Sequence, residues 1–127
     1  MWSIEPGVSV GPFSLGMKEE DYVARLGQVV DVFKRTPQSE NDVIAYDDAG
    51  VHLSVDRDRR VRLISVFTPN EVCLFEIQLL GRNISDVAKD MSRMGLQFRV
   101  VDAGLCCAAG NNMLVEVDGL ADGVEMD

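Results

Sequence analysis

Few residues of this chain have the chemistry that catalysis or metal binding requires. Its single histidine, His52, alternates with apolar neighbours and is expected on the polar face of a strand, as a surface histidine rather than a base or metal ligand. The acidic pairs Asp47 and Asp48, and Asp56 and Asp58, fall in expected turns, where aspartate bonds to the backbone. No phosphate-binding, dinucleotide-binding or nucleophile-elbow motif occurs. The sequence therefore predicts a protein that is not an enzyme and has no metal or organic cofactor.

The three cysteines give no metal or disulfide pattern. Cys73, Cys106 and Cys107 lack the C-x-x-C spacing of zinc and thioredoxin sites, and adjacent cysteines on a strand point to opposite faces. We expect all three to be reduced and to act as small apolar residues. The alternative is that Cys106 and Cys107 form a vicinal thiol pair that senses oxidants or soft metals.

The charge of the chain favours a basic partner. There are 21 acidic and 12 basic residues in 127, a net charge of −9, and no basic residue follows Arg99. Such a field repels nucleic acid and anionic membranes and attracts basic proteins. With 46% hydrophobic residues, the composition predicts one packed domain over 1–127. The absence of a long apolar run and of a signal peptide at the start predicts a cytoplasmic protein.

Periodicity predicts two helices and a series of antiparallel strands. A helix over 17–26 begins with acidic residues and ends at Gly27, and a helix over 83–94 has apolar residues at helical spacing and ends at Gly95. Alternation and turn residues predict a short extended segment over 10–16 and strands at 29–33, 42–46, 51–55, 61–67, 75–79, 96–100, 105–109, 113–117 and 124–126.

The two halves of the sequence follow the same order of elements. Each has a Leu-Gly pair, a helix closed by glycine, and later a strand that ends in Val-Asp, at 55–56 and at 117–118. This order predicts a tandem repeat with units of about 8–67 and 72–127. The expected fold class is α+β, with two helix-plus-meander units whose helices pack on one face of an antiparallel sheet.

The segment 10–27, VGPFSLGMKEEDYVARLG, carries the one resemblance to a known family. It resembles the opening of the small α/β units of the beta-lactamase inhibitory protein, an opening that the outer-membrane-assembly lipoproteins share. The hairpin over 46–66 is similar to the strands that follow in those units. The resemblance implies a binding module that uses an exposed sheet face, and the inhibitor it resembles is itself a tandem repeat.

These observations predict an immunity or inhibitor protein that neutralises a basic bacterial toxin by covering its active site. Electrostatic steering by carboxylates would bring the two proteins together. The alternatives are a structural or assembly module, or a small-molecule or redox sensor that uses the sheet face or the Cys106 and Cys107 pair. The predicted partner-binding residues are the carboxylates of the turns and final strands, namely Asp47, Asp48, Asp56, Asp58, Glu116, Asp118, Asp122 and Glu125.

Overall fold

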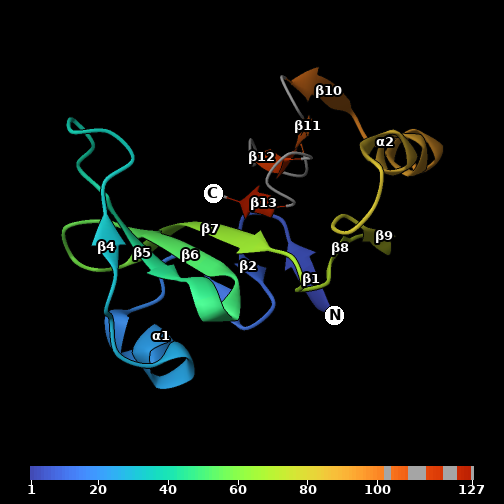
Figure 1. Ribbon diagram of the computed structural model, residues 1–127. Coiled ribbons are helices and arrows are strands. Elements are labelled where there is room, and N and C mark those ends of the chain that lie inside the picture. Colours follow the sequence, from blue (N-terminus) through green and yellow to red (C-terminus); the bar gives the residue numbers. More distant parts are fainter. Residues whose placement is uncertain (102–103, 109–113, 119–122, 127) are drawn as a thin grey trace.

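The chain folds as an α+β protein of mostly antiparallel strands. A computed structural model describes residues 1–101, 104–108, 114–118 and 123–126 (Figure 1). Its helices are α1 (Glu19–Leu26), α2 (Ile84–Arg93) and the short 3-10 helix η1 (Asp47–Ala49). Its strands are β1 (Trp2–Glu5), β2 (Ser9–Val10), β3 (Phe13–Ser14), β4 (Val32–Phe33), β5 (Asp42–Tyr46), β6 (Val51–Val55), β7 (Val61–Phe67), β8 (Val72–Leu74), β9 (Ile77–Gln78), β10 (Phe98–Val101), β11 (Gly104–Ala108), β12 (Leu114–Asp118) and β13 (Gly123–Met126).

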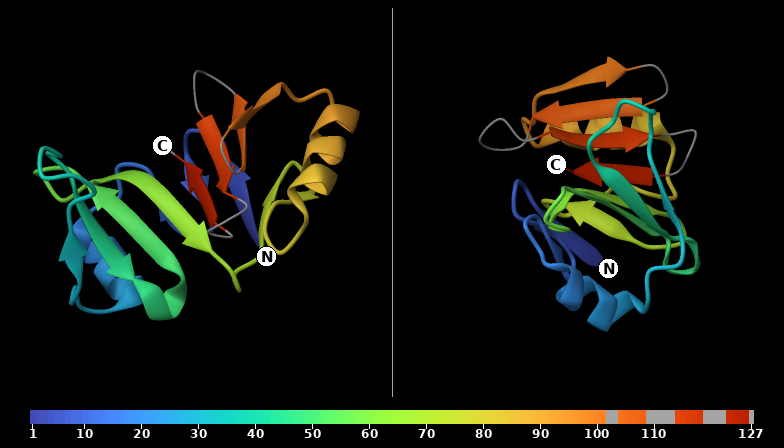
Figure 2. Two further views of the ribbon diagram at one scale, coloured as in Figure 1. Left: turned by 45° about the horizontal axis from the view of Figure 1, so that its top comes forward. Right: turned by 90° about the vertical axis from the view of Figure 1, so that its left-hand side faces the viewer.

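Two sheets organise these strands. The larger has eight antiparallel strands in the order β10-β11-β12-β13-β7-β6-β5-β4, and the smaller has five in the order β3-β2-β1-β8-β9. Each helix precedes a four-stranded meander, and the last strands of the two meanders, β7 and β13, pair with each other. Figure 2 shows the two meanders at an angle to each other, so that the large sheet is bent.

Both helices pack on the same face of the large sheet. Tyr22 of α1 and Val87 and Met91 of α2 are fully buried, and they belong to one hydrophobic cluster with Leu53 and Ile64 of the sheet. The small sheet completes this layer, as Figure 1 shows. The α+β fold class, with two α-helices and mostly antiparallel strands, is therefore as the sequence predicts.

Local chemistry sets the ends of both helices. Helix α1 begins two residues later than predicted, after Lys18, and three acidic residues in its first turn face the positive end of the helix dipole. It ends at Gly27, whose φ of 96° is accessible mainly to glycine. Helix α2 begins after Asn83, whose side-chain oxygen accepts a hydrogen bond of 2.8 Å from the N–H of Ser85. Both helices lie within the predicted ranges.

The prediction of one strand over 75–79 is wrong. That region holds the turn of a hairpin between β8 and β9, because Phe75 and Glu76 both adopt positive φ, 48° and 73°. The segment 10–16 likewise contains a hairpin turn, at Gly11 between β2 and β3. Only Val32 and Phe33 of the predicted strand 29–33 form β4. The predictions also missed β1, which pairs in parallel with β8.

The described helices include none that is both long and apolar enough to cross a bilayer.

Candidate functional site

The face of the large sheet that carries no helix is the candidate site. Because successive side chains of a strand alternate between faces, the cross-strand register places one set of residues opposite the core. The rows Ala45, His52, Ser65, Glu125 and Val43, Ser54, Leu63 run across β5, β6, β7 and β13. We call this surface the open face, because no helix covers it, and define it, among the described side chains, by Phe33, Val43, Ala45, His52, Ser54, Leu63, Ser65, Phe67 and Glu125. Of these, Val43, Ala45, Ser54 and Ser65 are buried, and the other side chains are at least partly exposed.

An aromatic cluster surrounds His52 at one end of the open face. The rings of Phe33 and Phe67 meet the imidazole edge to face, with centroids at 5.9 and 5.0 Å. His52 Nε2 and Asp47 Oδ1 form a hydrogen bond of 2.8 Å. His52 is therefore a half-buried, oriented side chain; the sequence led us to expect a solvated or loosely hydrogen-bonded surface histidine.

A polar network links the two meanders across this face. The Arg35 guanidinium donates to Glu125 Oε1 at 2.9 Å and to Ser65 Oγ at 3.4 Å, and Ser65 Oγ donates to Glu125 Oε1 at 3.3 Å. Ser65 is fully buried although no helix covers it, because these longer side chains lie over it. The network connects three segments that are far apart in the sequence: the loop that follows β4, strand β7 and strand β13.

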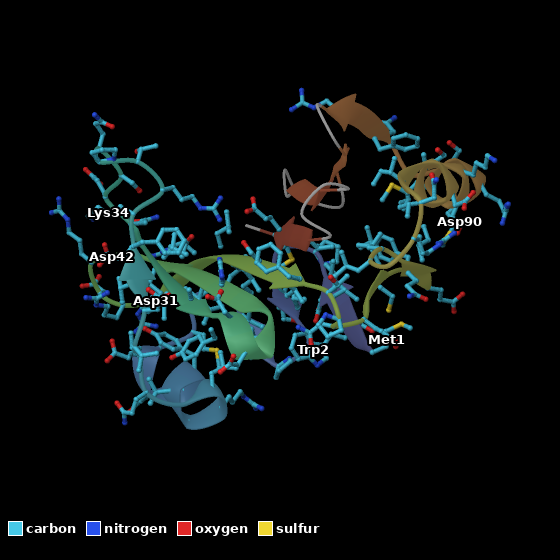
Figure 3. All side chains as sticks on the ribbon, in the orientation of Figure 1. Met1, Trp2, Asp31, Lys34, Asp42 and Asp90 are labelled. Atoms are coloured by element: carbon cyan, nitrogen blue, oxygen red, sulfur yellow. The ribbon has the colours of Figure 1, made fainter. Side chains whose placement is uncertain are left out.

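The loop over residues 34–41 arches above the open face, as the right-hand view of Figure 2 shows. Asp42 anchors its base, with salt bridges to Lys34 at 2.9 Å and to Arg59 at 3.1 Å. Figure 3 shows Lys34 and Asp42 at this base, and Asp31 at the other end of β4. The hydrogen bond from Lys34, together with the positive charges of Lys34 and Arg59, lowers the pKa of Asp42. An open pocket of about 300 Å³ remains between the loop and the sheet.

The groups on the open face can be compared with those that catalysis and binding require. A serine nucleophile needs an accessible hydroxyl beside a base, and Ser65 is instead enclosed by an ion pair. Within the described ranges, no cluster of three or more His, Cys, Asp or Glu side chains is placed to hold a metal ion. Aromatic rings, arginine and paired charges are typical of protein interfaces.

The predicted turn carboxylates form two separate groups. Asp47 and Asp48 lie in η1 before β6, and Asp56 and Asp58 lie in the turn after it. The five residues of β6 hold the groups roughly 17 Å apart, at about 3.3 Å per residue. The sequence prediction placed the two pairs in separate turns on either side of the strand over 51–55, as the fold does.

Asp56 has a role within the fold. Its carboxylate accepts hydrogen bonds from the N–H groups of Asp58 and Arg60 at 2.9 and 3.1 Å, and from Arg62 Nε at 2.7 Å. These bonds, the one from Arg60 foremost, lower the pKa of Asp56. Asp56 therefore shapes the hairpin turn, as aspartate commonly does.

The predicted carboxylates near the C-terminus lie on the second meander. Glu116 and Asp118 belong to β12, and the register sets Glu116 directly opposite Glu125 of β13. Glu125 is paired with Arg35, so it is not a free charge. Asp122 lies outside the described residues.

The cysteines take different positions in the two sheets. The backbones of Cys106 and Cys107 lie in β11, while Cys73 of β8 is a free thiol, half-buried, with Sγ 3.5 Å from the hydroxyl oxygen of Ser3.

Sequence reasoning missed most of this site, including Phe33, Arg35, Ser65 and Phe67. The alternation in β7 carried a signal, because Leu63, Ser65 and Phe67 share the face opposite Ile64 and Val66. The contact between Arg35 and Glu125 had no local signal, since 90 residues separate the two.

Comparisons with known proteins give one partial similarity. No protein-family model matches this chain, and no solved structure does. Among curated proteins it is similar to a PHAF1 protein of Arabidopsis thaliana, with 33% identity over 76 residues. The aligned stretch covers 53% of this chain and 18% of the plant protein. This chain therefore spans less than a fifth of the length of the relative it matches.

Proposed function

We propose that this protein is a non-enzymatic binding module that presents the open face to a basic protein partner. The observation that carries the proposal is the division of the large sheet into two faces. The helices and the small sheet cover one face, and the other is lined by His52, two phenylalanines and the Arg35–Glu125 pair. Of these residue types, phenylalanine and arginine are enriched at protein interfaces.

Charge supports a basic partner. The net charge of −9 gives a field that speeds association with a positively charged surface and weakens as salt is added. Asp31 and Asp48 are exposed beside one end of the open face, where β4 begins and β5 ends. A cationic surface docked on this face would lie close to both carboxylates.

The narrower form of the proposal is an inhibitor or immunity protein that covers the active site of a basic toxin. It rests on a duplicated fold of the kind that the resemblance to the beta-lactamase inhibitory protein implies. The two meanders support duplication, because each follows a helix and their final strands pair with each other in antiparallel fashion. Two related units joined in this way form one continuous binding face.

An assembly module is the second candidate. The open face suits it equally, because phenylalanine and arginine side chains are enriched at protein interfaces of every kind. In that case the open face joins other proteins without inhibiting an enzyme.

Photo-crosslinking tests the proposal. A photoreactive phenylalanine analogue replaces Leu63 on the open face or, as the matched control, Lys89, which is exposed on α2. We expect the Leu63 variant to crosslink a basic protein in its native cell, with a yield that falls as salt is raised. Crosslinking at Lys89 alone, or only to acidic proteins, would contradict the proposal.

The identity of the captured protein separates the two forms. The inhibitor form predicts that it is an enzyme whose activity falls when one equivalent of this protein is added. The assembly form predicts that its activity is unchanged.

A further inference from the structure

Strand β4 is an edge of the large sheet with an unused row of backbone groups. It pairs with β5. The N–H of Ala45 also donates to the carbonyl of Asp31 at 3.0 Å, so the hydrogen bonding between the two segments begins one residue before β4. In an antiparallel pair, alternate residues bond the neighbouring strand. Asp31 and Phe33 therefore face β5, and the N–H and C=O groups of Val30 and Val32 point to the free edge. The turn and loop hydrogen bonds of the described chain include none from Val30 or Val32.

The side chains of this edge are unusually apolar for an exposed strand. Val30 is 87% exposed and Val32 is 45% exposed. Natural proteins protect free edges with lysine, proline or a bulge, because an open edge recruits other strands. Val30 and Val32 are neither lysine nor proline and form no bulge, so this edge is suited to pair with another strand.

An acidic pocket lies where β4 begins. It has a volume of about 370 Å³ and is lined by Leu26, Val30 and Tyr46, and by the carboxylates of Asp31, Asp47 and Asp48, among other residues. Asp47 bonds His52, while Asp31 and Asp48 are exposed and have no salt bridge to any described residue. Apolar walls with carboxylates at the rim match the long stem and charged end of lysine or arginine.

We propose that β4 pairs with an extended segment of the basic partner, which adds a strand to the sheet and inserts a lysine or arginine into this pocket. The inference rests on the protein-binding function proposed above and names how the partner is held. The backbone of Val30 and Val32 supplies affinity that is independent of the partner's side chains, and the pocket supplies selection for a cation. A second copy of this chain is a poorer occupant, because it would bring another net charge of −9 to an acidic site.

Selection from a displayed library of random ten-residue peptides tests the inference and does not require the partner to be identified. The variant Val32→Pro removes an edge N–H and blocks pairing, and it leaves the bonds to β5 in place because that N–H points away from β5. Val30→Pro is the second variant, should Val32→Pro fail to fold. The double variant Asp31→Asn/Asp48→Asn removes charge from the pocket. Asp86→Asn, which changes an exposed aspartate on α2, is the matched control.

The expected peptides are rich in lysine or arginine and bind Val32→Pro about tenfold more weakly, a loss typical of one well-formed backbone contact. The Asp31→Asn/Asp48→Asn variant also binds more weakly, and binding by Asp86→Asn is unchanged. Amide exchange at Val30 and Val32 slows when a peptide is bound. Selection that yields no cationic peptides, or peptides that bind Val32→Pro as tightly as the wild type, overturns the inference.

The outcomes separate this inference from the proposed function. If edge variants bind normally but Leu63 still crosslinks a basic protein, the open face is the docking surface and the edge is not. If size-exclusion chromatography shows a concentration-dependent dimer that Val32→Pro abolishes, the occupant is a second copy and the inference is overturned. If peptides use the edge but Leu63 captures nothing, the edge pairing stands and the open-face proposal fails.

Discussion

The junction of the two meanders makes Gly123 a sensitive position. Gly123 of β13 is directly opposite Phe67 of β7, and a Cβ at this glycine would lie 2.7 and 2.8 Å from two ring carbons of Phe67. Carbon atoms in favourable contact are about 3.5 to 4.0 Å apart. The backbone of Gly123 is not in the left-handed region, so alanine there introduces a clash without backbone strain.

The variant Gly123→Ala should lower the free energy of unfolding by about 1–3 kcal/mol, the usual cost of overpacking. The Phe67 ring cannot easily move, because it packs on His52 at 5.0 Å. Urea unfolding, followed by circular dichroism, measures the change in midpoint at constant m-value. We expect Gly123→Ala to be neutral or slightly stabilising in a Phe67→Ala background, where the clash is absent.

Two results would refute this reasoning. An equal loss of stability from Gly123→Ala in both backgrounds means that contact with Phe67 is not the cause. No loss in the wild-type background means that β13 does not pair with β7 in this register.

Three further variants test the local contacts. Burial, with a smaller contribution from Glu19, raises the pKa of Tyr22 to about 12, so the fold should lose stability as pH rises from about 10 towards 12. Tyr22→Phe should resist this loss in urea titrations at several pH values. It should also gain stability at pH 7, because the buried hydroxyl has no hydrogen-bond partner among the described residues. Asn83→Ala should lower the free energy of unfolding by about 1 kcal/mol, because it removes the hydrogen bond from the N–H of Ser85 that caps α2. An unchanged free energy of unfolding would mean that this bond is absent in solution. The hydrogen bonds that lower the pKa of Asp56 stabilise the fold above pH 3.8, and this stabilisation is lost as pH falls below that value. Asp56→Asn should therefore have a lower free energy of unfolding at pH 7, and that free energy should fall less steeply in acid than it does in the wild type. The same fall in acid for both proteins would contradict this.

The elements that sequence reasoning predicted well are those with local signals. Strand β7 was predicted with its observed bounds, and β6 likewise, because apolar residues alternate in both between clear turns. Helix α2 follows from its N-cap at Asn83 and from the helical spacing of Val87 and Met91. In each case the pattern lies within about ten residues.

The errors arose where structure depends on distant or atypical contacts. The turn at Phe75 and Glu76 places two residues other than glycine at positive φ, so no turn signal marked it. Strand β1 pairs with β8 through Trp2 and Val72, which are far apart in the sequence. The aspartates of the candidate site were found by their charge, and their separation followed from the predicted strand over 51–55, but the pairing of Glu125 with Arg35 required the fold.

Amide hydrogen exchange of this protein, alone and bound to the partner captured through Leu63, tests the central proposal most directly. We predict that binding slows exchange at the β4 edge and in the loop over residues 34–41, and leaves the exposed surface of α2 unchanged. Protection confined to α2 and the small sheet, with the edge and loop exchanging as in the free protein, would contradict the assignment of the open face as the binding surface.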